Sequence, residues 1–180
     1  MFARLLRVLA CMLGAWLLGL GSVHLALRAS QGQANGAWRV WLSPGGPLSS
    51  PYVQAHYFRA LSLPPDSRQR LDFTAHADSS GARLDARCSY VISGNLPPAR
   101  WWSLELEGAP AGAISSGRAV LNEDGSLTVH AAALAMPGNW LKLPRGGSFG
   151  LVLRFHGPQG QLRRAPLQAS LPEIRREDCP

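Results

Sequence analysis

The chain has 180 residues, enough for one well-buried domain and too few for two of ordinary size. Hydrophobic residues make up 46% of the chain and charged residues only 16%, a balance that excludes global disorder. The 19 Gly and 14 Pro are spread along the sequence, which favours many short elements joined by turns and therefore a mainly β fold.

The net charge of +7 is concentrated in part at one end of the chain. Arg4, Arg7 and Arg28 flank an N-terminal apolar segment, and without them 15 basic and 11 acidic residues leave a charge of +4. The remaining Arg residues are dispersed, whereas proteins that bind nucleic acid concentrate positive charge on one face or in a run. We therefore expect no nucleic-acid partner.

The N-terminal segment is long enough to be a membrane anchor. Residues 8–27 include no formally charged residue, and a helix of that length rises about 30 Å, the thickness of the hydrocarbon core of a bilayer. Arg4 and Arg7 precede the segment, and the positive-inside rule places that end in the cytoplasm. We expect a retained single-pass transmembrane helix over residues 1–28 and a polar tether over residues 29–36. A cleaved signal peptide is the alternative, but its apolar region is normally shorter and ends at a small-residue cleavage site.

Residues 37–180 are expected to form one β domain with a single short helix. Alternation over residues 38–42 predicts a strand, and Pro51 suits the first position of a helix that Pro64 and Pro65 end. Further strands are predicted over residues 70–78, 87–94, 100–108, 148–157 and 171–177, with a hairpin over residues 117–131 that turns at Asp124 and Gly125. About seven short strands and one helix predict a mainly β fold, an antiparallel jelly-roll-like sandwich.

Two consecutive tryptophans open the strand predicted in "ARWWSLELEG". Side chains of a strand alternate between its faces, so Trp102 is expected in the core with Leu104 and Leu106. Trp101 falls on the opposite, polar face with Glu105, where burial by alternation does not explain it. Its ring either lies under a neighbouring loop or an Arg side chain, or forms the edge of a binding surface.

Four segments in order resemble the bacterial domain of unknown function 1214. They read "RCSYVISGNLPPARWWSLELEG", "NEDGSLTVH", "PGNWLKLP" and "FGLVLRFHGP". The resemblance implies an antiparallel jelly-roll-like fold and a location in the cell envelope, and it implies no mechanism. Some relatives carry an additional N-terminal domain, numbered 1254, and we expect this chain to be a short membrane-anchored member without it. Residues 108–117 form a shorter and plainer segment than the loop usual in the family.

The resemblance and the N-terminal charges together predict a cellular location and a membrane orientation. We expect a protein of the bacterial inner membrane, with its N-terminus in the cytoplasm and residues 37–180 in the periplasm. The expected partners are the lipid bilayer, through the N-terminal helix, and an unidentified envelope protein or glycan.

The cysteines fit an exported domain. Cys11 lies inside the apolar segment, whereas Cys88 and Cys179 both belong to the predicted periplasmic domain. Two cysteines in one exported domain are expected to form a disulfide, because the periplasm is oxidising. The alternative is a buried Cys88 thiol and a free Cys179 near the C-terminus.

A candidate ligand surface follows from the same alternation. His130 and His156 are both expected to point away from the core, since they alternate with Val129 and Phe155. If their strands are neighbours, the two imidazoles meet Arg154 on one outer surface. The candidate surface comprises outward-facing residues near these positions together with Arg100, which stands beside Trp101: Arg100, Trp101, Glu105, His130, Arg154 and His156.

The sequence contains no motif of a recognised chemistry. No pair of histidines has the His-x-x-x-His spacing of a metal site, and there is neither a Gly-x-Ser-x-Gly nucleophile motif nor a plausible Cys–His pair. We therefore predict no metal, no cofactor and no catalytic residue, and a binding or structural module. The alternative is an envelope enzyme directed at carbohydrate or lipid, which requires a polar cluster gathered in a pocket.

Overall fold

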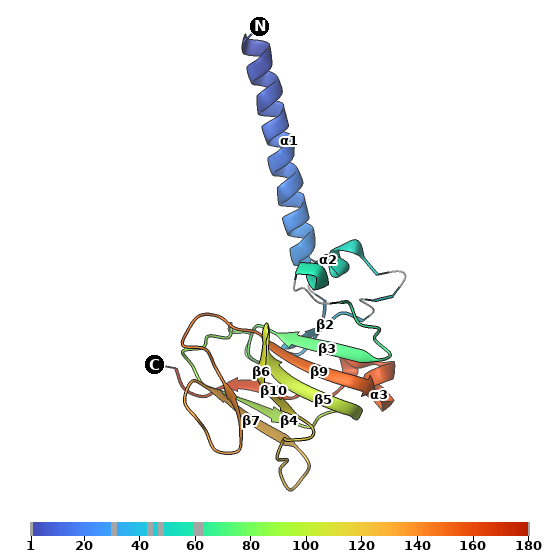
Figure 1. Ribbon diagram of the computed structural model, residues 1–180, viewed down its shortest axis with the longest axis vertical. Helices are drawn as coiled ribbons and strands as arrows, with labels where there is room; N and C mark the ends of the chain where they lie inside the picture. Colours follow the sequence, from blue (N-terminus) through green and yellow to red (C-terminus); the bar gives the residue numbers. More distant parts are fainter. Residues whose placement is uncertain (1, 30–31, 43–44, 47–48, 60–62, 180) are drawn as a thin grey trace.

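The computed structural model describes residues 2–29, 32–42, 45–46, 49–59 and 63–179 (Figure 1). The helices are α1 (Phe2–Ala29), α2 (Pro51–Arg59), α3 (Gly160–Arg164) and the short 3-10 helix η1 (Pro166–Gln168). The strands of the described part are β1 (Gln33–Asn35), β2 (Trp38–Val40), β3 (Arg70–Ala75), β4 (Tyr90–Gly94), β5 (Ala99–Leu106), β6 (Ala109–Ser115), β7 (Leu127–Ala132), β8 (Asn139–Lys142), β9 (Leu151–Pro158) and β10 (Glu173–Arg176).

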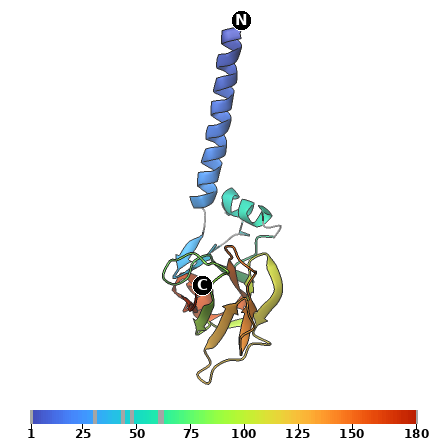
Figure 2. The same cartoon turned by 90° about the vertical axis from the view of Figure 1, so that its left-hand side faces the viewer.

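The N-terminal helix projects away from the β domain, as two perpendicular views show (Figures 1 and 2). Its 21-residue stretch Leu6–Ala26 is apolar and long enough to cross a bilayer, and none of it is buried in the protein. The C-terminal end of α1 lies against α2. The prediction of an N-terminal apolar helix is confirmed.

The strands form two sheets. One has six strands in the order β1-β2-β3-β9-β5-β6, and the other has four in the order β10-β4-β7-β8. Neighbouring strands are antiparallel except β7 and β8, which are parallel. The mainly β, two-sheet fold expected from the sequence is confirmed, with one parallel pair in place of a purely antiparallel arrangement.

The core lies between the two sheets and is built by alternation. In β3, Leu71 and Phe73 are buried inward, and the rings of Phe73 and Phe155 meet edge to face at 5.9 Å between centroids. Trp102 is buried in the same cluster, as predicted, whereas 40% of Trp101 is exposed. Burial of apolar side chains at about 25 cal/mol per Å² makes this cluster the main source of stability.

Several segments fold differently from their predictions. Gln33–Asn35, within the expected tether, is the edge strand β1, whose Asn35 side chain donates to the carbonyl of Ala169 at 2.8 Å. The segment after Glu107 is strand β6 instead of a plain loop. Gly160–Arg164 adds a second short helix. Residues 30–31 of the expected tether and residues 60–62, between the end of α2 and Pro64, lie outside the described residues.

The expected hairpin over residues 117–131 has a turn but only one strand. The turn is made as predicted, since Asp124 Oδ1 accepts from the backbone N–H of Ser126 at 2.9 Å. Before the turn, the side chain of Asn139 accepts from the N–H of Val120 and donates to its carbonyl. The backbone of Val120 is therefore satisfied by a side chain instead of a strand partner.

The predicted disulfide between Cys88 and Cys179 is present, with 4.2 Å between the two Cα atoms. It joins the segment before β4 to the chain after β10, and the N–H of Ser89 donates to the carbonyl of Asp178 at 2.8 Å. The cysteines are 91 positions apart, and closing a loop of that length stabilises the folded state by about 4–5 kcal/mol on the chain-entropy model.

Candidate functional site

The outer face of the six-stranded sheet, which points away from the four-stranded sheet, carries charged side chains on its three central strands. Asp72 of β3 pairs in register with Arg154 of β9, and Arg154 pairs with Ser103 of β5. The next row along the strands pairs Arg70 with His156 and His156 with Trp101. Directly opposite residues have close Cβ atoms, so three strands distant in sequence place these groups together.

Arg154 links two carboxylates across the sheet. Its Nε donates to Asp72 Oδ1 at 3.1 Å, and its Nη1 lies 2.7 Å from Glu105 Oε1. Arg70 Nε lies 3.1 Å from the same oxygen of Asp72. The side chains of Asp72 and Glu105 are only 9% and 10% exposed, so these ion pairs are shielded from water. We call Arg70, Asp72, Arg154 and Glu105 the ion network.

Helix α2 covers one side of the ion network. Its Tyr57 is buried, and its ring meets that of Trp41 at 5.9 Å between centroids in an edge-to-face arrangement. Burial raises the pKa of the Tyr57 phenol above its usual value, and the neighbouring Asp72 carboxylate raises it further. Tyr57 is therefore a neutral, buried group beside the β3 side of the network.

Trp101 stands at the other side of the ion network. Its ring lies 4.9 Å from the imidazole of His156, tilted by 57°. Burial lowers the pKa of His156 below its usual value, and the positive charges of Arg70 and Arg154 lower it further. The imidazole is therefore held in its neutral form, which packs against the tilted indole ring without the cost of burying a charge.

Trp101 and His156, together with Glu105 and Arg154 of the ion network, line a depression of about 530 Å³ on the outer face, beside strand β6. We call it the Trp101 depression. Its lining combines one exposed aromatic ring, charged groups of the ion network and small residues of β6: Trp101, Ser103, Glu105, Gly112, Ala113, Ser115, Arg118, Arg154 and His156.

Four of the six candidate residues line this depression, namely Trp101, Glu105, Arg154 and His156. Arg100 does not, since it precedes Trp101 on the strand and alternation points it to the opposite face. His130 does not either, because β7 belongs to the four-stranded sheet and β9 to the six-stranded one. The condition that would bring His130 beside His156 is not met, and its Nδ1 lies 4.0 Å from Glu177 Oε2 instead.

Sequence reasoning missed Arg70, Asp72, Ser103 and Arg118. Asp72 alternates with Leu71 and Phe73, so the sequence could have predicted that its side chain points away from the core. What the sequence did not show is that β9 lies between β3 and β5, which puts Asp72 beside Arg154.

The chemistry of the depression suits a polar ligand with an apolar face. An indole ring offers a flat apolar surface, while Glu105 accepts and the guanidinium groups of Arg118 and Arg154 donate hydrogen bonds. Within the described ranges, no three His, Cys, Asp or Glu side chains lie close enough together to hold a metal ion.

A family model described as protein of unknown function (DUF1214) matches residues 69–160. The chain belongs to this family. The DUF1214 segment includes every residue of the ion network and of the Trp101 depression, and it excludes α1 and α2. The resemblance seen in the sequence is thereby confirmed.

Two solved structures are similar to the chain. The VPA0106 protein from Vibrio parahaemolyticus shares 21% sequence identity with it, at a TM-score of 0.54 over 70% of this chain. An uncharacterized protein from Burkholderia cenocepacia shares 16% identity, at a TM-score of 0.49 over 82% of this chain. The chain covers 34% and 37% of those two chains, about a third of their length, and the likeness to the first concerns the fold alone. No curated protein matches the chain.

Proposed function

We propose that this DUF1214 protein is a binding module tethered to the bacterial inner membrane. In this proposal α1 spans the bilayer with its N-terminus in the cytoplasm, and the β domain lies in the periplasm. The Trp101 depression binds the sugar ring of an envelope glycan or glycolipid. The observation that carries the proposal is the exposed ring of Trp101 standing beside a shielded ion network.

The membrane part of the proposal rests on α1 and α2. The unburied apolar stretch of α1 needs an apolar surrounding, and a bilayer provides one. Beside its end, α2 exposes Tyr52 and Phe58, which are 44% and 61% accessible. Aromatic side chains are enriched where the bilayer meets water, so both suit the interface. A disulfide supports an oxidising compartment for the domain.

The binding part rests on rigidity as well as on chemistry. Arg154 is held from both sides by Asp72 and Glu105, so its position is fixed before a ligand arrives. Preorganised groups lose little conformational entropy on binding, which favours affinity. A sugar ring has an apolar face for the indole and hydroxyls for the charged groups, and it matches both halves of the lining.

The test measures binding of soluble oligosaccharides to the full chain in lipid nanodiscs. Saturation-transfer NMR with oligomers of N-acetylglucosamine, glucose and galactose is expected to detect at least one ligand. Trp101→Ala removes the stacking surface and is expected to abolish that signal, while Leu134→Ala, at an exposed position after β7, leaves it unchanged. No signal with any oligomer, or equal signals from both variants, contradicts the proposal. Cleavage of a bound oligomer favours the enzyme alternative instead.

A further inference from the structure

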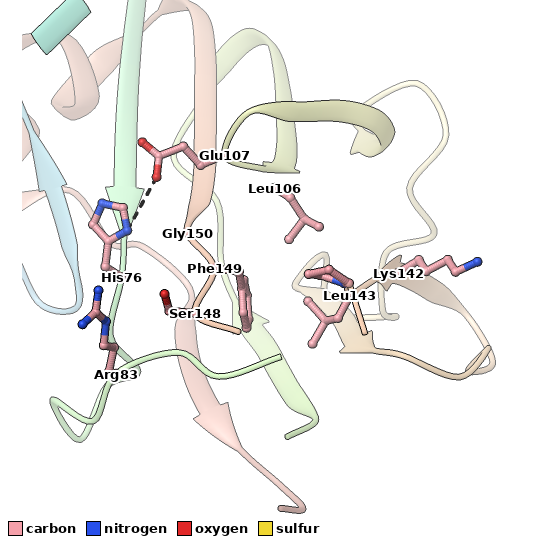
Figure 3. Close-up of a pocket in the computed structure, with 10 residues that line it drawn as sticks. His76, Arg83, Leu106, Glu107, Lys142, Leu143, Ser148, Phe149 and Gly150 are labelled. Carbon is pink, nitrogen blue, oxygen red and sulfur yellow. Dashed lines mark ion pairs between the residues drawn. The ribbon is translucent and has the colours of Figure 1, made fainter. Parts of the chain in front are cut away.

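A second depression of about 600 Å³ opens at the far end of the same strands (Figure 3). It lies where β3 and β5 end, where β9 begins, and beside the end of β8 in the other sheet. We call it the end groove. Along β5, Glu107 is six residues from Trp101, or about 20 Å at 3.3 Å per residue, so the two depressions are separate. The end groove is lined by His76, Arg83, Leu106, Glu107, Lys142, Leu143, Pro144, Ser148, Phe149 and Gly150.

One side of the end groove is apolar. Leu106, Leu143 and Phe149 lie together on it, from three different strands or strand ends (Figure 3). The ring of Phe149 is held in place by an edge-to-face contact with Tyr90, at 5.6 Å between centroids. This side therefore offers an apolar surface in which the Phe149 ring is fixed by its neighbour.

The other side is polar and depends on Gly150. His76 Nδ1 and Glu107 Oε2 meet over this residue at 3.6 Å, from strands on either side of β9. A Cβ at position 150 would lie 2.5 Å from Glu107 Oε2 and 2.8 Å from His76 Nδ1. The pair therefore meets in the space that a side chain at position 150 would enter.

Arg83 adds a positive charge to the polar side. Within the described residues, neither Arg83 nor Lys142 has a carboxylate within ion-pair distance. The backbone of Arg83 is fixed, since it bridges to Ala77 and its carbonyl accepts from Arg176 at 2.8 Å. A neighbouring depression of about 600 Å³ shares His76 and Arg83 and is also lined by Arg39 and Asp78.

We propose that the end groove binds a small amphipathic anion, an aromatic or short aliphatic group that bears a carboxylate or phosphate. The apolar group lies over Phe149 and Leu106, the partly exposed apolar side chains of the groove. The anion pairs with Arg83 and accepts from the hydroxyl of Ser148, which lies between Arg83 and Phe149 in Figure 3. A guanidinium binds carboxylate and phosphate oxygens through paired hydrogen bonds, which selects an anion over a neutral or cationic analogue.

The test uses the full chain in lipid nanodiscs and four water-soluble fluorinated probes observed by fluorine NMR. At millimolar concentration the fluorine resonances of the two anions, 4-fluorobenzoate and 4-fluorophenyl phosphate, are expected to broaden on binding. The matched neutral and cationic probes, 4-fluorobenzyl alcohol and 4-fluorobenzylamine, are expected to bind at least about tenfold more weakly, a difference that one charge-assisted hydrogen bond supplies.

Two variants localise the binding. Arg83→Gln is expected to weaken the anions about tenfold, whereas Arg163→Gln, at an exposed position on α3 beyond the opposite end of β9, leaves them unchanged. Arg83 is exposed, and its removal is not expected to disturb the core. The proposal is overturned if neither anion binds, if the amine binds as well as the benzoate, or if the two variants bind alike. Because Trp101 lies outside the groove, this outcome is independent of glycan binding.

Discussion

Removing Arg154 from the ion network is expected to destabilise the β domain without unfolding it. In Arg154→Met, Glu105 loses the guanidinium at 2.7 Å and Asp72 keeps only Arg70. Leaving one partner of a fully buried ion pair uncompensated costs about 3–5 kcal/mol. Arg154 is 27% exposed and Asp72 retains one partner, so we expect a smaller loss in the free energy of unfolding, about 2–3 kcal/mol. For a domain of this size, that lowers the unfolding temperature by about 4–12 °C.

The assay is thermal and urea unfolding of the full chain in detergent, followed by near-UV circular dichroism. Arg175→Met, an exposed strand position, is the matched control and is expected to change the free energy of unfolding by less than about 0.5 kcal/mol. Adding Glu105→Gln to Arg154→Met removes the orphaned charge and is expected to restore about 1 kcal/mol. If Arg154→Met costs no more than the control, or if the two changes in the double variant are additive, the ion network is not a coupled unit.

Three further predictions test other parts of the structure. The pKa of His156 is lowered in the folded state, so the unfolded state binds more protons and stability is expected to fall as the pH drops below the ordinary pKa of about 6.5. His156→Gln should make the unfolding temperature depend less on pH between pH 7 and about pH 5, and an unchanged pH dependence would refute the assignment. Cys179→Ser is expected to lower the free energy of unfolding by about 2–5 kcal/mol, and dithiothreitol should destabilise the parent but not this variant; equal sensitivity would exclude the disulfide. In nanodiscs, a polarity-sensitive dye on Phe58→Cys in a Cys11→Ser background is expected to emit to the blue of the same dye on Leu134→Cys, and identical spectra would place α2 away from the bilayer.

The direction of side chains within each strand could be predicted because it depends only on neighbours in sequence. Alternation divided the two tryptophans of β5 correctly, with Trp102 in the core and Trp101 exposed. It also directed Glu105, Arg154 and His156 away from the core, to the face where the depression lies. A period of two residues is a local property of a regular strand.

The order of the strands could not be predicted, because it depends on contacts between distant segments. β9 lies between β3 and β5, although β4 through β8 come before it in the chain. That order brings Asp72 to Arg154 and puts His130 on the other sheet. The short strands were missed for a related reason, since β1 and β8 are stabilised by partners that no local pattern reveals.

The shielding of the ion network argues for a role beyond stability. The solvent face of an antiparallel sheet ordinarily carries charges that remain hydrated, whereas Asp72 and Glu105 are about nine-tenths covered. A shielded ion pair seldom stabilises a fold more than apolar side chains of similar volume would. What the network does provide is a guanidinium fixed in direction at the edge of the Trp101 depression. A fixed cation beside an exposed ring is the arrangement that a preorganised binding surface needs, and it is the reason for proposing one here.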